Sequence, residues 1–300
     1  MSDWRSYDAI ADDFDRIWSA RFTAVARRMA ELAAPRAGDA VLDIGTGTGI
    51  LAAALAEASS WNLPVEAAAR SEAVIPDAPS PRPDAAHAKF SAATLRLLVG
   101  CDRSREMLFR ARARVARLRL AISDVTALPF ADESFDRITA GFVVSHVPDY
   151  RQVFREAWRV ARPSGRFALS SWTPAADEHT TAWNEILAAA ISKSEMQRAS
   201  AEIVPWEEHF ARAGALEAAL AEAGFAVAGR GEIVEVSSPL TLEQFVEDRS
   251  LTTAGRLGQS LLGAERWARF RSAALESLRA RFGDAIVYRR GARIAVGRKQ

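Results

Sequence analysis

Residues 40–49 of the chain read Ala-Val-Leu-Asp-Ile-Gly-Thr-Gly-Thr-Gly. The first five form a short apolar run of the kind that is buried in a parallel sheet, and helix-forming residues follow from Ile50 to Leu55. The order strand, glycine turn, helix is typical of a wound α/β fold. A dinucleotide-binding fingerprint needs a third glycine where this chain has Ile50, so a dinucleotide site is disfavoured.

An acidic residue ends the next strand-like run. Residues 95–101 are mostly apolar and lead into Asp102, and Ser104 is placed to cap the following helix. In wound nucleotide-binding folds this carboxylate receives the ribose hydroxyls and lies about 20 positions after the first motif. Asp102 lies 59 positions after Asp43, and omitting residues 59–94 restores a spacing of 23. We interpret this proline-rich segment as an insertion away from the site: a surface loop, a partner-binding arm or translated non-coding sequence.

The remaining parallel strands are followed by distinctive polar motifs. Residues 118–123 predict the third strand, and the sequence after it has the pattern D-x-x-x-L-P-F then S-F-D over residues 124–136. The fourth strand, ending near Val143, overlaps the pattern F-x-x-x-H-x-x-D of residues 142–149, and residues 166–172 predict the fifth strand. All of these motifs follow strand ends, so we expect them at one edge of the sheet.

Taken together, these motifs resemble those of the class I S-adenosylmethionine (SAM) dependent methyltransferases, in the branch that contains the quinone C-methylases and many small-molecule methylases. The similarity covers residues 40–172 apart from the insertion, although Ser164 stands where the family commonly has a glycine. The resemblance implies an α/β, Rossmann-like doubly wound sheet of seven strands with the last strand antiparallel. It also implies that SAM is the cofactor.

The resemblance further implies which residues contact SAM. Asp43 would accept hydrogen bonds from the ammonium group or bound water, and Asp102 from both ribose hydroxyls. Asp124 would accept a hydrogen bond from the adenine amino group, and the Val125 N–H would donate one to a ring nitrogen of adenine. Two alternatives stay open: the glycines only form a tight turn, or Asp124 only caps one. The expected cofactor-binding set is Asp43, Gly45, Thr46, Gly47, Gly49, Asp102, Arg103, Met107, Asp124, Val125 and Phe142.

His146, just beyond the fourth strand, is the candidate catalytic base. Methyl transfer needs a base only where the acceptor must lose a proton, and histidine suits that task near neutral pH. The alternative is a structural histidine that caps the local backbone, and His179 and His209 are weaker candidates. The strand end lacks an added acidic cluster, so no metal site is expected.

The rest of the chain is expected to surround this core within a single domain of residues 1–300. In the segment before the core, Phe14 replaces a tyrosine that the family often has, which keeps an aromatic cover without the hydroxyl. Amphipathic helices after residue 172 are expected to form an apolar lid over the strand ends. The expected parts are N-terminal cofactor-covering helices (1–38), a SAM-binding core (39–172) with the insertion (59–94), a helical lid (173–215 and 239–283), and a closing helix and strands (216–238 and 284–300).

Composition excludes several other functions. The 39 Lys and Arg residues balance 38 Asp and Glu residues, so the chain lacks the strong positive field of a nucleic-acid binder. Residues 140–143 also differ from the N-P-P-Y turn of exocyclic-amine methylases of DNA. Cys101 is the only cysteine, which favours a cytoplasmic location, and no apolar run approaches the ~18 residues that span a bilayer. The acidic N-terminal residues do not resemble a signal peptide.

The sequence therefore predicts a cytoplasmic enzyme that transfers a methyl group from SAM to oxygen or carbon of a small, largely apolar metabolite. The alternative is a SAM-binding protein without methyl transfer, either regulatory or repurposed. The expected partner is a small-molecule acceptor, with no nucleic acid and no membrane span. The identity of the acceptor and the oligomeric state stay open.

Overall fold

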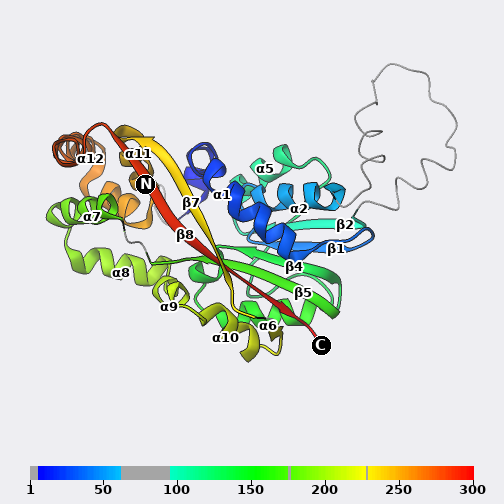
Figure 1. The fold of residues 1–300 in the computed structure, drawn as a ribbon. Helices are drawn as coiled ribbons and strands as arrows, with labels where there is room; N and C mark the ends of the chain where they lie inside the picture. The colour runs from blue at the N-terminus through cyan, green and yellow to red at the C-terminus, as the bar shows by residue number, and fades with distance from the viewer. Residues whose placement is uncertain (1–5, 62–94, 175–176, 228) are drawn as a thin grey trace, which may run out of the picture.

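The computed structural model describes residues 6–61, 95–174, 177–227 and 229–300 (Figure 1). Most of the expected insertion, residues 62–94, lies outside the described residues. Its expected first residues, 59–61, are not loop but the last turn of helix α2, which ends at Trp61.

The elements follow the order that the sequence predicts. The helices are η1 (Asp8–Ile10), α1 (Ala11–Ala33), α2 (Ile50–Trp61), α5 (Arg105–Arg114), η2 (Val144–His146), α6 (Tyr150–Val160), α7 (Glu178–Ala190), α8 (Lys193–Ile203), α9 (Glu207–Ala211), α10 (Ala215–Glu222), α11 (Leu242–Leu251) and α12 (Thr253–Phe282). The strands are β1 (Ala40–Ile44), β2 (Leu97–Asp102), β3 (Arg119–Ile122), β4 (Phe135–Gly141), β5 (Ala161–Trp172), β6 (Ala226–Val227), β7 (Glu232–Thr241) and β8 (Ala285–Arg298).

One mixed sheet joins all strands of the described residues. Its order is β3-β2-β1-β4-β5-β8-β6, and β7 pairs with another part of β8. Strands β1 to β5 are parallel, whereas β8 is antiparallel to β5, β6 and β7. The expected α/β class with an antiparallel last strand is therefore confirmed.

The expected strand count was wrong by one. Residues 227–236 were predicted as one strand, but the structure divides this part of the chain between β6 and β7. Gly229 lies between them with a φ of 82°, and such a left-handed residue interrupts an extended strand. Strand β7 also continues to Thr241, so residues 239–241 belong to the sheet and not to the helical lid. Pro239 is tolerated there because, among the described strands, β7 pairs only with β8.

Two apolar cores cover the two faces of the sheet. Residues of β1 alternate between them: Val41 packs with α1 and α2, whereas Leu42 and Ile44 pack with α6 and α10. Helix α6 buries Val153, Phe154 and other residues at helical spacing against the second core. The first core continues into α7, α11 and α12, which gather at the end of the molecule away from β2 and α5 (Figure 1).

The chain reverses direction across the sheet beside β1. From β1 it proceeds outward to β2 and β3, and it then returns to β4 on the other side of β1. In wound α/β folds ligands bind at this switch point, outside the carboxyl ends of the strands. The topology therefore places the predicted motifs at one edge.

Ser164 lies where the family commonly has glycine, and its backbone explains that preference. Its φ is 66°, in the left-handed region that costs an L-residue about 1–2 kcal/mol. The Ser164 N–H donates to the Lys299 carbonyl at 2.9 Å, which holds the turn against the last residues of the chain.

Candidate functional site

A cavity of about 870 Å³ opens at the carboxyl ends of the parallel strands. Of the twelve predicted site residues, eleven line this cavity, including the three carboxylates and His146. Gly49 does not line it. The lining residues from the sequence prediction are Asp43, Gly45, Thr46, Gly47, Asp102, Arg103, Met107, Asp124, Val125, Phe142 and His146.

Glycine stands at three positions of the turn after β1, and the structure gives a different reason for each. All have positive φ, at 62° for Gly45, 54° for Gly47 and 82° for Gly49. A Cβ on Gly45 would lie 2.3 Å from a methyl carbon of Val143, and one on Gly49 would lie 2.9 Å from the Ala111 Cα of α5. Gly47 meets no such obstruction and lines the cavity, so its backbone is open to a ligand. Gly49 instead permits close packing of α2 on α5.

Asp43 stabilises this turn through its buried carboxylate. Its carboxylate accepts hydrogen bonds from the hydroxyls of Thr46 and Thr139, both at 2.7 Å, and the residue is only 1% exposed. Burial raises the pKa of Asp43 to about 6, although the two hydroxyls oppose the shift and the nearby Asp102 adds to it. Asp43 still lines the cavity, so it retains acceptor capacity for a cationic group.

Asp102 links the tip of β2 to the same turn. One carboxylate oxygen accepts the Gly47 N–H at 3.0 Å, and the other accepts the Ser104 N–H at 2.9 Å. Burial raises the pKa of Asp102, while these backbone hydrogen bonds and Arg103 act in the opposite direction. Ser104 also caps α5 by accepting the Met107 N–H at 3.1 Å, and Met107, in the first turn of that helix, lines the cavity. The remaining lone pairs of Asp102 can accept two neighbouring hydroxyls.

Asp124 forms a turn of its own after β3. One of its oxygens accepts the backbone N–H of Thr126 at 2.8 Å and the Thr126 hydroxyl at 2.7 Å. These hydrogen bonds lower the pKa of Asp124. One oxygen of Asp124 therefore caps the turn, as the alternative interpretation expected, and the other accepts no hydrogen bond from the described residues. Nor does the N–H of Val125 donate to any backbone or side-chain acceptor described in the structure.

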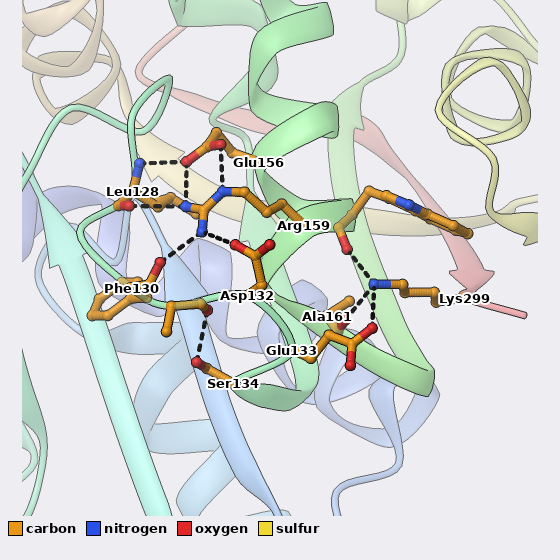
Figure 2. A network of polar contacts seen from close by, with 11 residues as sticks. Leu128, Phe130, Asp132, Glu133, Ser134, Glu156, Arg159, Ala161 and Lys299 are labelled. Carbon is orange, nitrogen blue, oxygen red and sulfur yellow. Dashed lines mark hydrogen bonds and ion pairs between the residues drawn. The ribbon is translucent and has the colours of Figure 1, made fainter.

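The loop that carries Asp124 and Val125 is held by a cation from α6. Figure 2 shows the Arg159 guanidinium donating to the carbonyls of Leu128 and Phe130, at 3.0 and 2.7 Å. Glu156 orients Arg159 through two hydrogen bonds and also accepts the Leu128 N–H at 2.8 Å. The L-P-F motif is thus anchored through its backbone to α6, while Asp124 and Val125, at the start of the same loop, line the cavity.

Aromatic rings form a continuous wall of the cavity. Phe142 stacks on Trp172 with ring centroids 4.3 Å apart, and Phe22 of α1 contacts both rings. Phe14 and Trp18 extend the stack along α1. Phe142 has a φ of 59°, so the chain accepts a strained backbone at the end of β4 to hold this ring. Such a wall excludes water and suits an apolar ligand.

His146 lies on the cavity side of η2. Burial lowers the pKa of His146 to about 4, and the Arg256 and Arg103 cations act in the same direction while Glu207 opposes them. Its Nδ1 is buried without a hydrogen-bond partner among the described residues, and the Tyr7 ring meets the imidazole edge to face at 6.0 Å. His146 is therefore a neutral imidazole with a nitrogen available to a ligand. Of the described histidines only this one lines the cavity, so His179 and His209 lie elsewhere.

Sequence reasoning missed three charged residues of the cavity. Glu207 and Arg290 pair at 2.8 Å, and Arg290 also lies over the Trp172 ring. Arg249 of α11 is only 6% exposed and faces the cavity. One signal was present in the sequence: Arg249 lies three and four positions after Val246 and Phe245, on the apolar face of its helix.

The described residues contain neither a candidate metal site nor a helix that could span a membrane. The described part of the chain contains no group of three or more His, Cys, Asp or Glu side chains that could hold a metal ion. Across the same residues, no helix combines the length and apolarity needed to cross a membrane.

Comparison with known proteins agrees with this geometry. A family model described as a methyltransferase domain matches residues 83–169. Residues 83–169 therefore lie in a methyltransferase domain. The match includes the motif around Asp124 and confirms the resemblance drawn from it, whereas the glycine turn at residues 45–49 lies outside the matched residues.

Curated relatives of the methyltransferase domain include quinone methyltransferases. The demethylmenaquinone methyltransferase of Roseiflexus castenholzii is 36% identical over 139 residues, which are 46% of this chain and 44% of that protein. The ubiquinone/menaquinone biosynthesis C-methyltransferase of Desulfotalea psychrophila is 28% identical over 178 residues, 57% of this chain and 58% of that protein. The chain thus spans about half the length of these relatives.

Solved structures support the fold of the methyltransferase domain. A putative type II methyltransferase from Anaeromyxobacter dehalogenans aligns with a TM-score of 0.54 and 17% identity, covering 92% of this chain and 95% of that one. A putative methyltransferase from Bacillus halodurans aligns with a TM-score of 0.51 and 17% identity, covering 91% and 98%. At this identity the agreement concerns the fold alone.

Proposed function

We propose that the protein transfers a methyl group from SAM to oxygen or carbon of a small, largely apolar acceptor. The observation that carries the proposal is the convergence of Asp43, Asp102 and Asp124, from three successive strand ends, on one cavity with an aromatic wall. The methyltransferase domain match and the quinone methyltransferase relatives support the same activity.

The residues of the cavity fit SAM. Asp43 would hold the ammonium group, Asp102 the ribose hydroxyls, and Asp124 with the Val125 N–H the adenine edge. The open backbone at Gly47 leaves room that a Cβ would occupy, and Met107 is an apolar contact for the base. When bound, SAM supplies a methyl group on a sulfonium, which is already an excellent leaving group.

The residues of the chain then have three tasks. Phe22, Phe142 and Trp172 exclude water and orient an apolar acceptor, which supplies much of the rate enhancement for a displacement that needs little covalent help. His146 accepts a proton from an acceptor that must lose one, because its imidazole is neutral at physiological pH. Residues of α7, α8, α9 and α11 close the cavity over the acceptor.

The wider setting is part of the proposal. The net charge of +1 argues against a nucleic-acid acceptor, and the single buried cysteine, Cys101, favours a reducing, cytoplasmic location. The sheet and both cores are consistent with a single domain over residues 1–300, in which the lid helices are additions to the SAM-binding core.

Calorimetry with SAM followed by turnover of methyl-labelled SAM tests the proposal. We expect saturable 1:1 binding, and label transfer to at least one member of a panel of quinols, phenols and activated methylene compounds. Absence of SAM binding would show that the proposal is wrong. Binding without transfer to any acceptor would favour the alternative, a SAM-binding protein that does not methylate.

A further inference from the structure

Arg249 is a buried cation without an anionic partner among the described residues. Its side chain lines the cavity, the residue is 6% exposed, and Nε has no hydrogen-bond partner in the described structure. Its identified contacts are with aromatic rings: the guanidinium carbon lies 5.5 Å from the Phe245 ring centroid, 5.8 Å from that of Tyr288 and 6.0 Å from that of Trp18. A buried unpartnered charge is expensive, so native proteins pair such groups or use them.

The acidic residues nearby have other partners: two are paired with other arginines, and a third caps α7. Asp248 is paired with Arg21, through a contact that leaves one carboxylate oxygen without a hydrogen bond. Glu207 is paired with Arg290. Asp177 also acts on Arg249 but forms no ion pair with it, and its carboxylate accepts the Thr180 N–H at the start of α7 at 2.7 Å. Burial lowers the pKa of Arg249 and Arg290 acts in the same direction, whereas Tyr288, Asp248 and Asp177 oppose the shift.

A second unused polar group faces the same part of the cavity. Thr180, on α7, is 9% exposed, and its hydroxyl oxygen has no hydrogen-bond partner among the described residues. Helices α7 and α11 lie at the end of the molecule away from β2 and α5, which carry or adjoin the expected ribose and adenine contacts (Figure 1). The unused donors therefore belong to the half of the cavity that remains for the acceptor.

We propose that Arg249 binds a carboxylate on the methyl acceptor, so that the substrate class is a small apolar molecule with one carboxylate group. This inference rests on the proposed function, since it names the acceptor of that same site. The guanidinium offers two parallel N–H donors that match a carboxylate. Folding has already removed its water, so a bound carboxylate gains a charge-assisted contact in surroundings of low dielectric constant.

Matched pairs of ligands test the charge preference directly. Protein saturated with S-adenosylhomocysteine is titrated by calorimetry with benzoate and benzamide, and with hexanoate and hexanamide, which differ mainly in charge within each pair. We expect at least one carboxylate to bind about tenfold or more tightly than its amide. If no carboxylate in the series exceeds its amide, the proposal is wrong. This comparison needs no variant, so it decides the matter even if substitutions impair folding.

Substitutions then assign the preference to Arg249. In Arg249→Gln the carboxylate and its amide should bind with nearly equal affinity, so that the ratio of their affinities is near one. Arg249→Lys should keep part of the preference for the carboxylate, because the charge remains. Arg289→Gln, at an exposed position on β8, is the control and should keep the wild-type ratio. A ratio that survives in Arg249→Gln overturns the assignment.

The cofactor also has a carboxylate, and the same experiment separates the two sources. We expect Arg249→Gln to leave the Kd for S-adenosylhomocysteine within about twofold of wild type. A tenfold loss of that affinity with an unchanged carboxylate preference would show that Arg249 serves the cofactor and would overturn the inference. If wild-type protein does not bind S-adenosylhomocysteine, the proposed function fails instead, and the ligand pairs are compared on the free protein to judge Arg249 separately.

Discussion

The carboxylate of Asp102 accepts the backbone N–H of Gly47 at 3.0 Å, and this contact joins the end of β2 to the glycine turn that follows β1. The acid expected to hold the ribose therefore also fixes the backbone expected to lie under the amino-acid end of SAM. A change at either residue alters both parts of the cavity.

Replacing Asp102 with asparagine should weaken SAM binding by about 10- to 100-fold. The amide has one acceptor oxygen and no charge, so it cannot keep both backbone contacts and accept two hydroxyls, and hydrogen bonds to charged groups contribute about 1.5–3 kcal/mol each. Calorimetry with SAM measures the effect. Asp284→Asn, which changes an exposed partner of Arg279 outside the cavity, is the matched control. An Asp102→Asn Kd within twofold of wild type would contradict the ribose assignment.

Alanine substitutions at two glycines with positive φ distinguish the effect of steric obstruction from that of backbone strain. Gly45→Ala adds a Cβ 2.3 Å from a Val143 methyl carbon, whereas Gly38→Ala, at a φ of 83°, meets no atom within 4 Å. Both should lose about 1–2 kcal/mol of stability from the left-handed backbone, and Gly45→Ala should lose more. We expect only Gly45→Ala to lose SAM affinity as well. Urea unfolding and calorimetry measure the two effects, and equal SAM affinities for the two variants would contradict this account of the turn.

Arg159 is expected to act on the cofactor site through the loop that it anchors. Arg159→Gln removes the paired donors to the Leu128 and Phe130 carbonyls, so amides of residues 124–134 should exchange hydrogen faster and SAM affinity should fall several-fold. Arg155→Gln is the control, since Arg155 is an exposed residue of the same helix that pairs with Gln152 and Asp149. Unchanged exchange in Arg159→Gln would mean that the loop is held by its apolar contacts.

The buried imidazole of His146 should make the folded state less stable as the pH decreases. Its folded pKa of about 4 lies below the ordinary value of 6.5, so between these values the unfolded state binds more protons than the folded state. The contribution is fully present above pH 6.5 and is lost as the pH falls toward 4, by at most about 1.4 kcal/mol per pH unit.

Urea unfolding of wild type and His146→Gln at pH 7.5, 6.0 and 5.0 measures this contribution. The stability of wild type relative to His146→Gln should decrease at each step. Asp43 acts in the opposite direction, because its raised pKa favours the folded state as the pH falls, but it is present in both proteins and cancels in the difference. Parallel pH profiles for the two proteins would contradict the lowered pKa of His146.

Much of the cofactor half could be predicted from the sequence, because its signals are local. The glycine turn, the acids at the strand ends and the capping serine of α5 lie within short segments, so their spacing already determines that they meet at one edge of the sheet. Gly49 is the exception: its neighbour is Ala111, a contact that no local pattern reveals.

The acceptor half could not be predicted in the same way. Glu207, Arg249 and Arg290 come from α9, α11 and β8, and only tertiary packing brings them to one cavity. The eighth strand was missed for a related reason, since β6 has only two residues and is a strand because β8 lies beside it. An arginine among apolar positions, as at Arg249, was the available signal of a buried charge.

Strand β8 has a consequence for how the protein is made. It pairs with β5 although about 113 residues separate Trp172 from Ala285, so at the usual rates of synthesis the ribosome exposes β5 on the order of ten seconds before its neighbour exists. During that interval β5 is paired with β4 on one side only, and its other edge, at Phe167 and Leu169, is open to strands of other chains. Yield in a recombinant host should therefore respond to chaperone supply and to the speed of translation through residues 173–284.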